Sequence, residues 1–202
     1  MTRAEFAARL KNACAAVTAA EAELTEIDSK FGDADHGLTM AKIAGAISEA
    51  VDAAEGGIQS MLDDAAMAVM TLNGGSAVPL WNTWLDGLQE EAPEGEEIDV
   101  AGLKAIFAKA LEELEDMSGA KVGDKTMMDA LIPASEAVAA YTGDSADELF
   151  DAAAQAAAQG AEATKQYVSK FGRAKSYGTK TIGTPGAGAG SMSWFFQGLA
   201  RE

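Results

Sequence analysis

The sequence predicts an all-α protein of about eight helices, and three observations lead to this fold class. Apolar residues recur every three or four positions through nearly the whole chain, which is the spacing of helices that bury one face. Glycine-rich or acidic stretches separate these runs from one another. No segment alternates apolar and polar residues between turn signals, as a half-buried strand would.

Start and stop signals set the limits of the expected helices. Glycine pairs at 56–57 and 74–75 each end a stripe, and Asp99 is placed to cap the helix that follows it. Ser145 and Glu148 form a capping box before a long alanine-rich helix. The eight expected stripes cover residues 6–27, 40–51, 58–72, 80–88, 103–114, 127–141, 149–168 and about 191–199.

Composition limits the class of protein and its partners. The 202 residues are 48% hydrophobic, which is enough for one sizeable core, so we expect a single domain over 1–202. Because the net charge is −17, nucleic acid and anionic membranes are disfavoured as partners. The chain has no apolar run of about 20 residues and no signal-peptide core, so we expect a soluble, cytoplasmic protein. The single cysteine, Cys14, lies on an apolar stripe and is expected in the core.

The most informative segment is 28–37, Asp-Ser-Lys-Phe-Gly-Asp-Ala-Asp-His-Gly. It gathers Asp28, Asp33, Asp35 and the chain's only histidine, His36, between two expected helices. Carboxylates about 5 Å apart repel by roughly 3 kcal/mol per pair at an effective dielectric near 20. A Mg²⁺ ion removes this cost and leaves coordination positions for water and phosphate. The segment is therefore a candidate magnesium site.

A simpler interpretation remains open, in which Asp33 or Asp35 only caps the helix that begins near Leu38 and nearby lysines balance the charge. An EF-hand is excluded. Counting from Asp33, the loop glycine stands at the fifth position instead of the sixth, and no glutamate follows at the twelfth.

Three further loops between the expected helices, at 73–77, 119–126 and 172–191, are rich in glycine and hydroxyl residues. Such residues at helix starts expose backbone N–H groups that bind phosphate with help from the helix dipole. If the loops share one end of the molecule, they form a nucleotide-binding cup. The alternative is that each glycine cluster is only a helix cap and a turn.

Taken together, these segments resemble a known family, the nucleotide-binding subunit of dihydroxyacetone kinase. The resemblance runs through almost the whole chain in order. It rests on the aspartate loop at 28–37, Gly74-Gly75-Ser76, the Gly-Asp-Lys-Thr-Met stretch within 119–131, and Gly172-Arg173-Ala174.

The resemblance implies an antiparallel barrel of eight helices that holds ADP or ATP at one rim through two Mg²⁺ ions. It places the metal ligands at Asp28, Asp33 and Asp35, and it gives Arg173 and His36 catalytic roles as well as nucleotide contacts. The other nucleotide-contacting residues that it implies are Gly37, Leu38, Thr39, Ser76, Ala77, Gly119, Met127, Gly186 and Gly188. The chain departs from the family at Thr184, where an aspartate is usual, and at Val78, where a glycine is common.

The resemblance also implies partners. In the family a histidine on a separate subunit or domain holds the ketose, whereas His36 already belongs to the metal loop. A sugar-binding dihydroxyacetone kinase subunit is therefore expected as a partner. The expected reaction passes the terminal phosphoryl group of bound ATP to a short-chain ketose. ADP is then recharged by a phosphocarrier of the sugar phosphotransferase system, or free ATP serves as the donor.

Two rival functions come from other classes. A nucleotide-sensing module would use the same cup without turnover, and the altered loop at 184–190 is compatible with that use. A purely structural helical protein would have no use for clustered aspartates at a helix junction.

Overall fold

A computed structural model describes residues 1–201 of the chain. These residues form helices throughout, and apart from one isolated bridge between Thr2 and Glu97 they form no β-structure. The α-helices are α1 (Arg3–Ala19), α2 (Glu21–Ser29), α3 (His36–Ala53), α4 (Ile58–Met70), α5 (Ala77–Glu90), α6 (Val100–Ser118), α7 (Met128–Ala140), α8 (Ala146–Ala163) and α9 (Ala187–Leu199). Two 3-10 segments, η1 (Thr164–Gln166) and η2 (Arg173–Thr181), join α8 to α9. The expected all-α class is confirmed.

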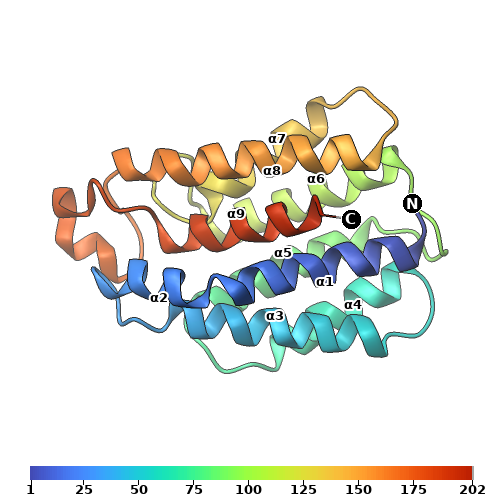
Figure 1. Ribbon diagram of the computed structural model, residues 1–202, viewed down its shortest axis with the longest axis horizontal. Helices are drawn as coiled ribbons and strands as arrows, with labels where there is room; N and C mark the ends of the chain where they lie inside the picture. The colour runs from blue at the N-terminus through green and yellow to red at the C-terminus, as the bar shows by residue number, and fades with distance from the viewer. Residues whose placement is uncertain (202) are drawn as a thin grey trace.

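Eight of the helices close into an antiparallel barrel (Figure 1). Helix α1 packs on α3, α3 on α4, and so on in chain order to α9, which packs back on α1. The short α2 lies beyond the end of α1 and packs on α3. Because direction alternates around the ring, α3, α5, α7 and α9 all begin at the end of the barrel where α2 and η2 lie (Figure 1).

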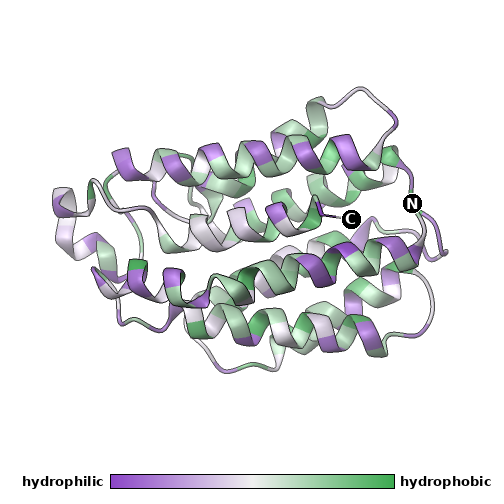
Figure 2. Ribbon diagram, in the orientation of Figure 1, coloured by the Kyte–Doolittle hydropathy of each residue, from purple (hydrophilic) through white to green (hydrophobic). Residues whose placement is uncertain are grey.

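The barrel is filled by apolar side chains, while hydrophilic residues are spaced along the outer faces of the helices (Figure 2). Trp84 stands near its centre, with ring centroids 5.6 Å from Trp81 and 5.4 Å from Phe195, both in edge-on contacts. Edge-to-face pairs of this kind add about 0.5–1.5 kcal/mol beyond area burial. Cys14 is buried in the same core, and burial raises its thiol pKa to about 12, so it is a core residue and no nucleophile.

Two element boundaries differ from the expectation. The stripe at 6–27 is two helices, because the backbone breaks at Ala20, which caps α1 and starts α2. No glycine or proline marks this break. The stripe at 149–168 ends as α-helix at Ala163, after which η1 tightens the last turn.

The segment at 172–191, expected as a loop, is partly helical. It contains η2 and the first turn of α9, which begins at Ala187 instead of near Ser191. A glycine-rich run can enter a helix where close packing requires small residues. Gly188 meets this condition, since a methyl group there would lie 3.1 Å from the backbone N of Met127.

The expected capping box at Ser145 is only half formed. The Ser145 hydroxyl accepts a hydrogen bond from the backbone N of Glu148 at 3.3 Å. The Glu148 carboxylate instead accepts from the Tyr141 hydroxyl at 2.8 Å.

None of the helices formed by residues 1–201 is long and apolar enough to cross a membrane.

Close approach of α1 and α9 closes the barrel, and it depends on Gly198. A methyl group at this position would collide with the backbone of Asn12 and Ala13. We expect Gly198→Ala to destabilise the fold by about 1–3 kcal/mol, because the two helices must move apart. Gly45, in α3, is the matched control, since a methyl group there meets nothing within 4 Å. Gly45→Ala should stabilise by about 0.5–1 kcal/mol. Urea unfolding measures both, and equal effects of the two substitutions would contradict this account.

Candidate functional site

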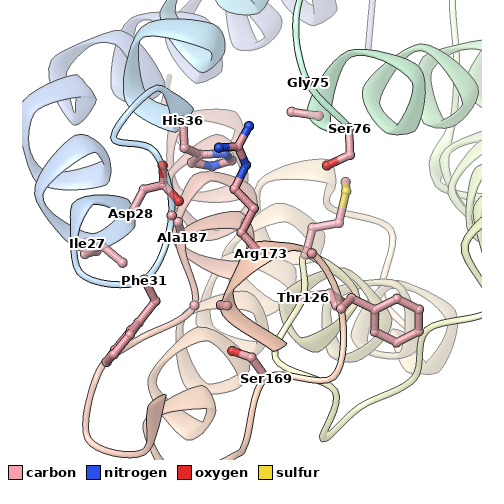
Figure 3. Close-up of a pocket in the computed structure, with 18 of the residues that line it drawn as sticks. Ile27, Asp28, Phe31, His36, Gly75, Ser76, Thr126, Ser169, Arg173 and Ala187 are labelled. Atoms are coloured by element: carbon pink, nitrogen blue, oxygen red, sulfur yellow. The ribbon is translucent and has the colours of Figure 1, made fainter. Parts of the chain in front are cut away.

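A cavity of about 390 Å³ opens at the end of the barrel where α3, α5, α7 and α9 begin. Its walls come from four segments far apart in the sequence, each made of a loop and the helix residues beside it. They are 27–39, 75–81, 125–127 and 169–188. Figure 3 shows labelled residues from all four walls around one space. The aspartate loop and the three glycine-containing loops thus do meet at one end, as a shared cup requires.

The helix starts at this end have few side-chain caps, although the backbone N of Met128, the first residue of α7, donates to the Thr126 hydroxyl at 3.2 Å. Among the residues described, none of the N-cap residues of α3, α5, α7 and α9 makes a side-chain cap hydrogen bond. At the opposite end α1, α6 and α8 each have one, whereas α4, which starts after Gly57, has none. Uncapped N–H groups and the helix dipoles together favour an anion. Residues at or beside these four starts line the cavity: His36, Ala77, Met127 and Ala187.

Asp28, Asp33 and Asp35 form a tight carboxylate cluster on one wall of the cavity. Each offers an oxygen, and these oxygens all lie within 4.8 Å of one another. Asp28 accepts a hydrogen bond from the backbone N of Asp35 at 3.2 Å, which folds the loop onto the end of α2. Gly32 makes room for this fold, because a side chain there would collide with Asp28. An all-oxygen set of this kind suits a hard divalent cation such as Mg²⁺.

Arg173 reaches this cluster from the opposite side of the cavity mouth. Its guanidinium lies 2.7 Å from the Asp33 carboxylate, and its side chain is 70% exposed. Figure 3 shows the side chain extending into the space between His36 and Ser76. Close by, the ring centroids of Phe31 and Tyr177 lie 5.1 Å apart. The aspartate loop and η2 are therefore joined by one ion pair and one aromatic contact.

His36 is fixed against α9. Its Nε2 lies 3.2 Å from the Ser191 hydroxyl, which in turn donates to the Gly188 carbonyl at 3.0 Å. Burial lowers the pKa of His36, and the nearby Asp28 charge opposes this shift. The ring is therefore held in place between α3 and α9 at the base of the carboxylate cluster.

Buried polar groups shape the other walls. Asp129, fully buried, accepts hydrogen bonds from the backbone N of Gly123 at 2.6 Å and of Thr126 at 2.7 Å. Burial raises the pKa of Asp129, against the effect of these two N–H groups. Thr164 accepts from the backbone N of Gly186 at 2.8 Å. These bonds fix the loops that start α7 and α9.

The cavity brings together most of the residues singled out in the sequence. Those that line it are Asp28, Asp33, Asp35, His36, Thr39, Ser76, Ala77, Met127, Arg173, Gly186 and Gly188. Three others lie outside the lining. Gly37 packs against the backbone of α2, Leu38 is 49% exposed on the outside of α3, and Gly119 is the left-handed C-cap of α6.

Several lining residues had no assigned role at the sequence level. They are Phe31, Trp81, Lys125, Thr126, Ser169 and Phe171. Lys125 and Thr126 belong to the Gly-Asp-Lys-Thr-Met stretch, so their position in that motif was the available signal. Trp81 carried none, because an aromatic residue on an apolar stripe is indistinguishable from core. Phe31 lies within the aspartate loop, so its place in that motif was the signal.

Comparison with known proteins agrees with this geometry. Residues 30–201 match the DAK2 domain family. The chain is 35% identical to an L-erythrulose kinase of Pectobacterium atrosepticum, over 96% of this chain and 34% of that protein. It is 28% identical to the ADP-binding subunit DhaL of the PEP-dependent dihydroxyacetone kinase of Escherichia coli, over 93% of this chain and 91% of that subunit.

A solved structure has the same fold. The dihydroxyacetone kinase from C. freundii, in complex with AMP-PNP and Mg²⁺, superposes with a TM-score of 0.73 at 24% identity, covering 98% of this chain and 33% of that one. The chain spans about a third of the length of the erythrulose kinases that it matches.

The fold and the cavity thus define a class of domain, a helical barrel with a carboxylate-lined cup at one end. The chain belongs to the DAK2 domain family, and its likeness to the DhaL subunits covers most of both chains. The family resemblance found in the sequence is confirmed.

Proposed function

We propose that this chain is the nucleotide- and Mg²⁺-binding part of a kinase for short-chain ketoses. In this role it presents the terminal phosphoryl group of ATP to a ketose held by a partner subunit or domain. The observation that carries the proposal is the meeting, in one cavity, of a three-carboxylate cluster with four helix starts whose N-cap residues make no side-chain cap hydrogen bond. A cation site beside an anion site is what a metal–nucleotide complex requires.

The acidic residues of the cavity would bind the metal ion, and the N–H donors would bind the phosphates. Asp28, Asp33 and Asp35 would hold the metal, and their oxygens fit a hard cation. When bound, Mg²⁺ would neutralise phosphate charge and orient the phosphates. Ser76 and Ala77, at the start of α5, offer N–H groups to phosphate oxygens.

Arg173 is placed to stabilise the charge that is transferred. Its fork of N–H donors matches phosphate geometry, and it stands at the cavity mouth where an acceptor would arrive. His36 orients the base of the site through Ser191 and carries less positive charge than an exposed imidazole, because burial lowers its pKa. On the remaining wall, Met127 offers a soft apolar surface for a base.

The ketose is expected on another protein surface. His36 is the only histidine of the chain, and its Nε2 is already bonded to the Ser191 hydroxyl on α9, so it is not free to capture a carbonyl group. Erythrulose kinases and dihydroxyacetone kinase subunits both occur among the relatives, which favours a three- or four-carbon ketose as substrate. Recharging of bound ADP by a phosphocarrier and exchange for free ATP are both consistent with the cavity.

Asp35 offers the cleanest test of the metal site, because among residues 1–201 it makes no ion pair, whereas Asp33 is bonded to Arg173. We expect Asp35→Asn to weaken Mg²⁺-dependent ADP binding by about tenfold or more while the helical signal stays unchanged. Titration calorimetry with and without EDTA measures this. Asp63→Asn, an equal charge change on the exposed face of α4, is the control. The metal assignment is wrong if ADP binds the Asp35 variant as it binds the parent chain.

Arg173→Lys should slow phosphoryl transfer by about tenfold or more with little change in melting temperature. The lysine keeps the charge but loses the planar fork, and the exposed side chain contributes little to folding. Rapid-quench measurement of transfer to the ketose on the partner gives the rate. Lys175→Arg, two residues along on the exposed surface of η2, should behave like the parent.

The isolated chain should not phosphorylate dihydroxyacetone or erythrulose from ATP, because its own cavity offers no second histidine. Activity is expected only when a ketose-binding subunit is added. A single burst that resumes on addition of a phosphocarrier would identify recharging of bound ADP, whereas sustained turnover on ATP would identify the ATP-dependent form. Turnover by the chain alone would refute this division of labour, and nucleotide binding without transfer to any partner would favour a sensing module.

A further inference from the structure

Lys125 has an unusual backbone for its residue type. Its φ is 62°, in the left-handed region that disfavours side chains with a Cβ, and within residues 1–201 only Ala34 shares this among residues other than glycine. The residue lies in the wall of the cavity, just before α7. Such a conformation persists only where surrounding contacts hold it.

The contacts of Lys125 are two backbone carbonyls far apart in the sequence. Its Nζ donates to the Tyr167 carbonyl at 3.1 Å and to the Thr181 carbonyl at 2.5 Å. Burial lowers the pKa of Lys125, and Asp129 opposes that shift. Residues 167–181, here called the strap, leave the barrel and return to it at these two carbonyls. One ammonium group therefore closes the base of the strap.

Other bonds at the base tie the strap to the same loop. The backbone N of Ser169 donates to the Thr181 hydroxyl at 3.0 Å, which joins the two ends directly. The backbone N of Lys170 donates to the Asp124 carbonyl at 3.1 Å, and its Nζ lies 2.6 Å from the Asp124 carboxylate. Thr181 is fully buried and Ser169 nearly so. The base of the strap is thus ordered, and it rests on the residues around Lys125.

The tip of the strap has no comparable support. Phe171, Arg173 and Tyr177 are exposed, and the tip meets the opposite wall through the Arg173–Asp33 ion pair and the Phe31–Tyr177 contact. Exposed ion pairs contribute little to ordering a segment. The direction in which Arg173 points therefore depends on how firmly the base is held.

We propose that Lys125 is a positioning residue, which clamps the base of the strap and so holds Arg173 over the cavity mouth. The effect of Lys125 on phosphoryl transfer rests on the proposed function, whereas its effect on the order of the strap does not. Lysine suits this role because it reaches two carbonyls with separate N–H donors of one ammonium group. A methionine has a similar length and no donor, so Lys125→Met removes the clamp and keeps most of the volume.

Hydrogen exchange of the nucleotide-free chain tests the clamp. In Lys125→Met we expect amides of the strap, including those of Ser169 and Lys170, to exchange about tenfold or more faster, with the barrel helices unchanged. Lys121→Met is the matched control, since Lys121 is exposed in the same loop and makes no ion pair within the part of the chain described. Lys125→Arg, which retains donors, should restore part of the protection.

Two results would overturn the clamp. Strap exchange in Lys125→Met equal to that of the parent would mean that the other base contacts suffice. Loss of the helical signal or faster exchange throughout the barrel would mean that Lys125 supports the whole fold and has no local role.

A double-mutant cycle tests whether Lys125 acts through Arg173. With the ketose-binding partner present, Lys125→Met and Arg173→Ala should each slow transfer by about tenfold or more, with a smaller effect on ADP affinity. Adding Lys125→Met to Arg173→Ala should cost no more than roughly a further twofold, because the residue being positioned is already gone. Independent, multiplying effects would show that Lys125 does not act through Arg173. If the parent shows no transfer with any partner, the kinase proposal fails while the exchange result on the clamp still stands.

Discussion

Alternation of helix direction around a closed ring is the constraint on which the site depends. An even number of antiparallel neighbours sends every second helix start to the same end, so the dipoles of α3, α5, α7 and α9 converge there. That convergence would be costly if left uncompensated. This end has the carboxylates of the aspartate loop and an open cavity, and none of its four N-cap residues makes a side-chain cap hydrogen bond, whereas three of the four helices that start at the far end are capped in this way. The barrel thus has most of its capped helix starts at one end and the cavity at the other.

The polar interior of the molecule follows the same division. Asp129, Thr164, Thr181 and Ser191 are fully buried, and each bonds to backbone or side chains that shape the cavity end. A loop has no regular pattern of internal backbone hydrogen bonds as a helix has, so its buried N–H groups need side-chain acceptors. A small set of buried polar residues therefore holds four loops in register, while the apolar core around Trp84 holds the helices.

The sequence alone was sufficient for the fold class and for the members of the carboxylate cluster, but not for the construction of the walls. Each helix buries one face, so helical periodicity is visible in the sequence. The three aspartates lie within eight residues, so their clustering can also be read directly. The break at Ala20 could not be read, since packing of α2 on α3 ends α1 there without a breaker residue. The start of α9 at Ala187 was hidden by its glycines, which serve close packing. The Lys125 bonds join residues 42 and 56 positions apart, and no local pattern encodes them.

Charge is unevenly placed along this acidic chain. Five of its 15 lysines and arginines fall within 165–180, and residues 163–201 contain no Asp or Glu, although the net charge is −17. Four of these five side chains stand exposed on the strap, and one of them, Arg173, lines the cavity. At physiological salt the field of the distant acidic surface is screened within about 8 Å, so the charges that count at the cavity are the nearby ones, Arg173 and the three carboxylates of the aspartate loop. The segment that carries Arg173 therefore also carries Lys170, Lys175 and Lys180. Because the Lys125 ammonium group binds both ends of this segment, it bears on where these basic side chains stand, including the Arg173 to which we assign a role in transfer.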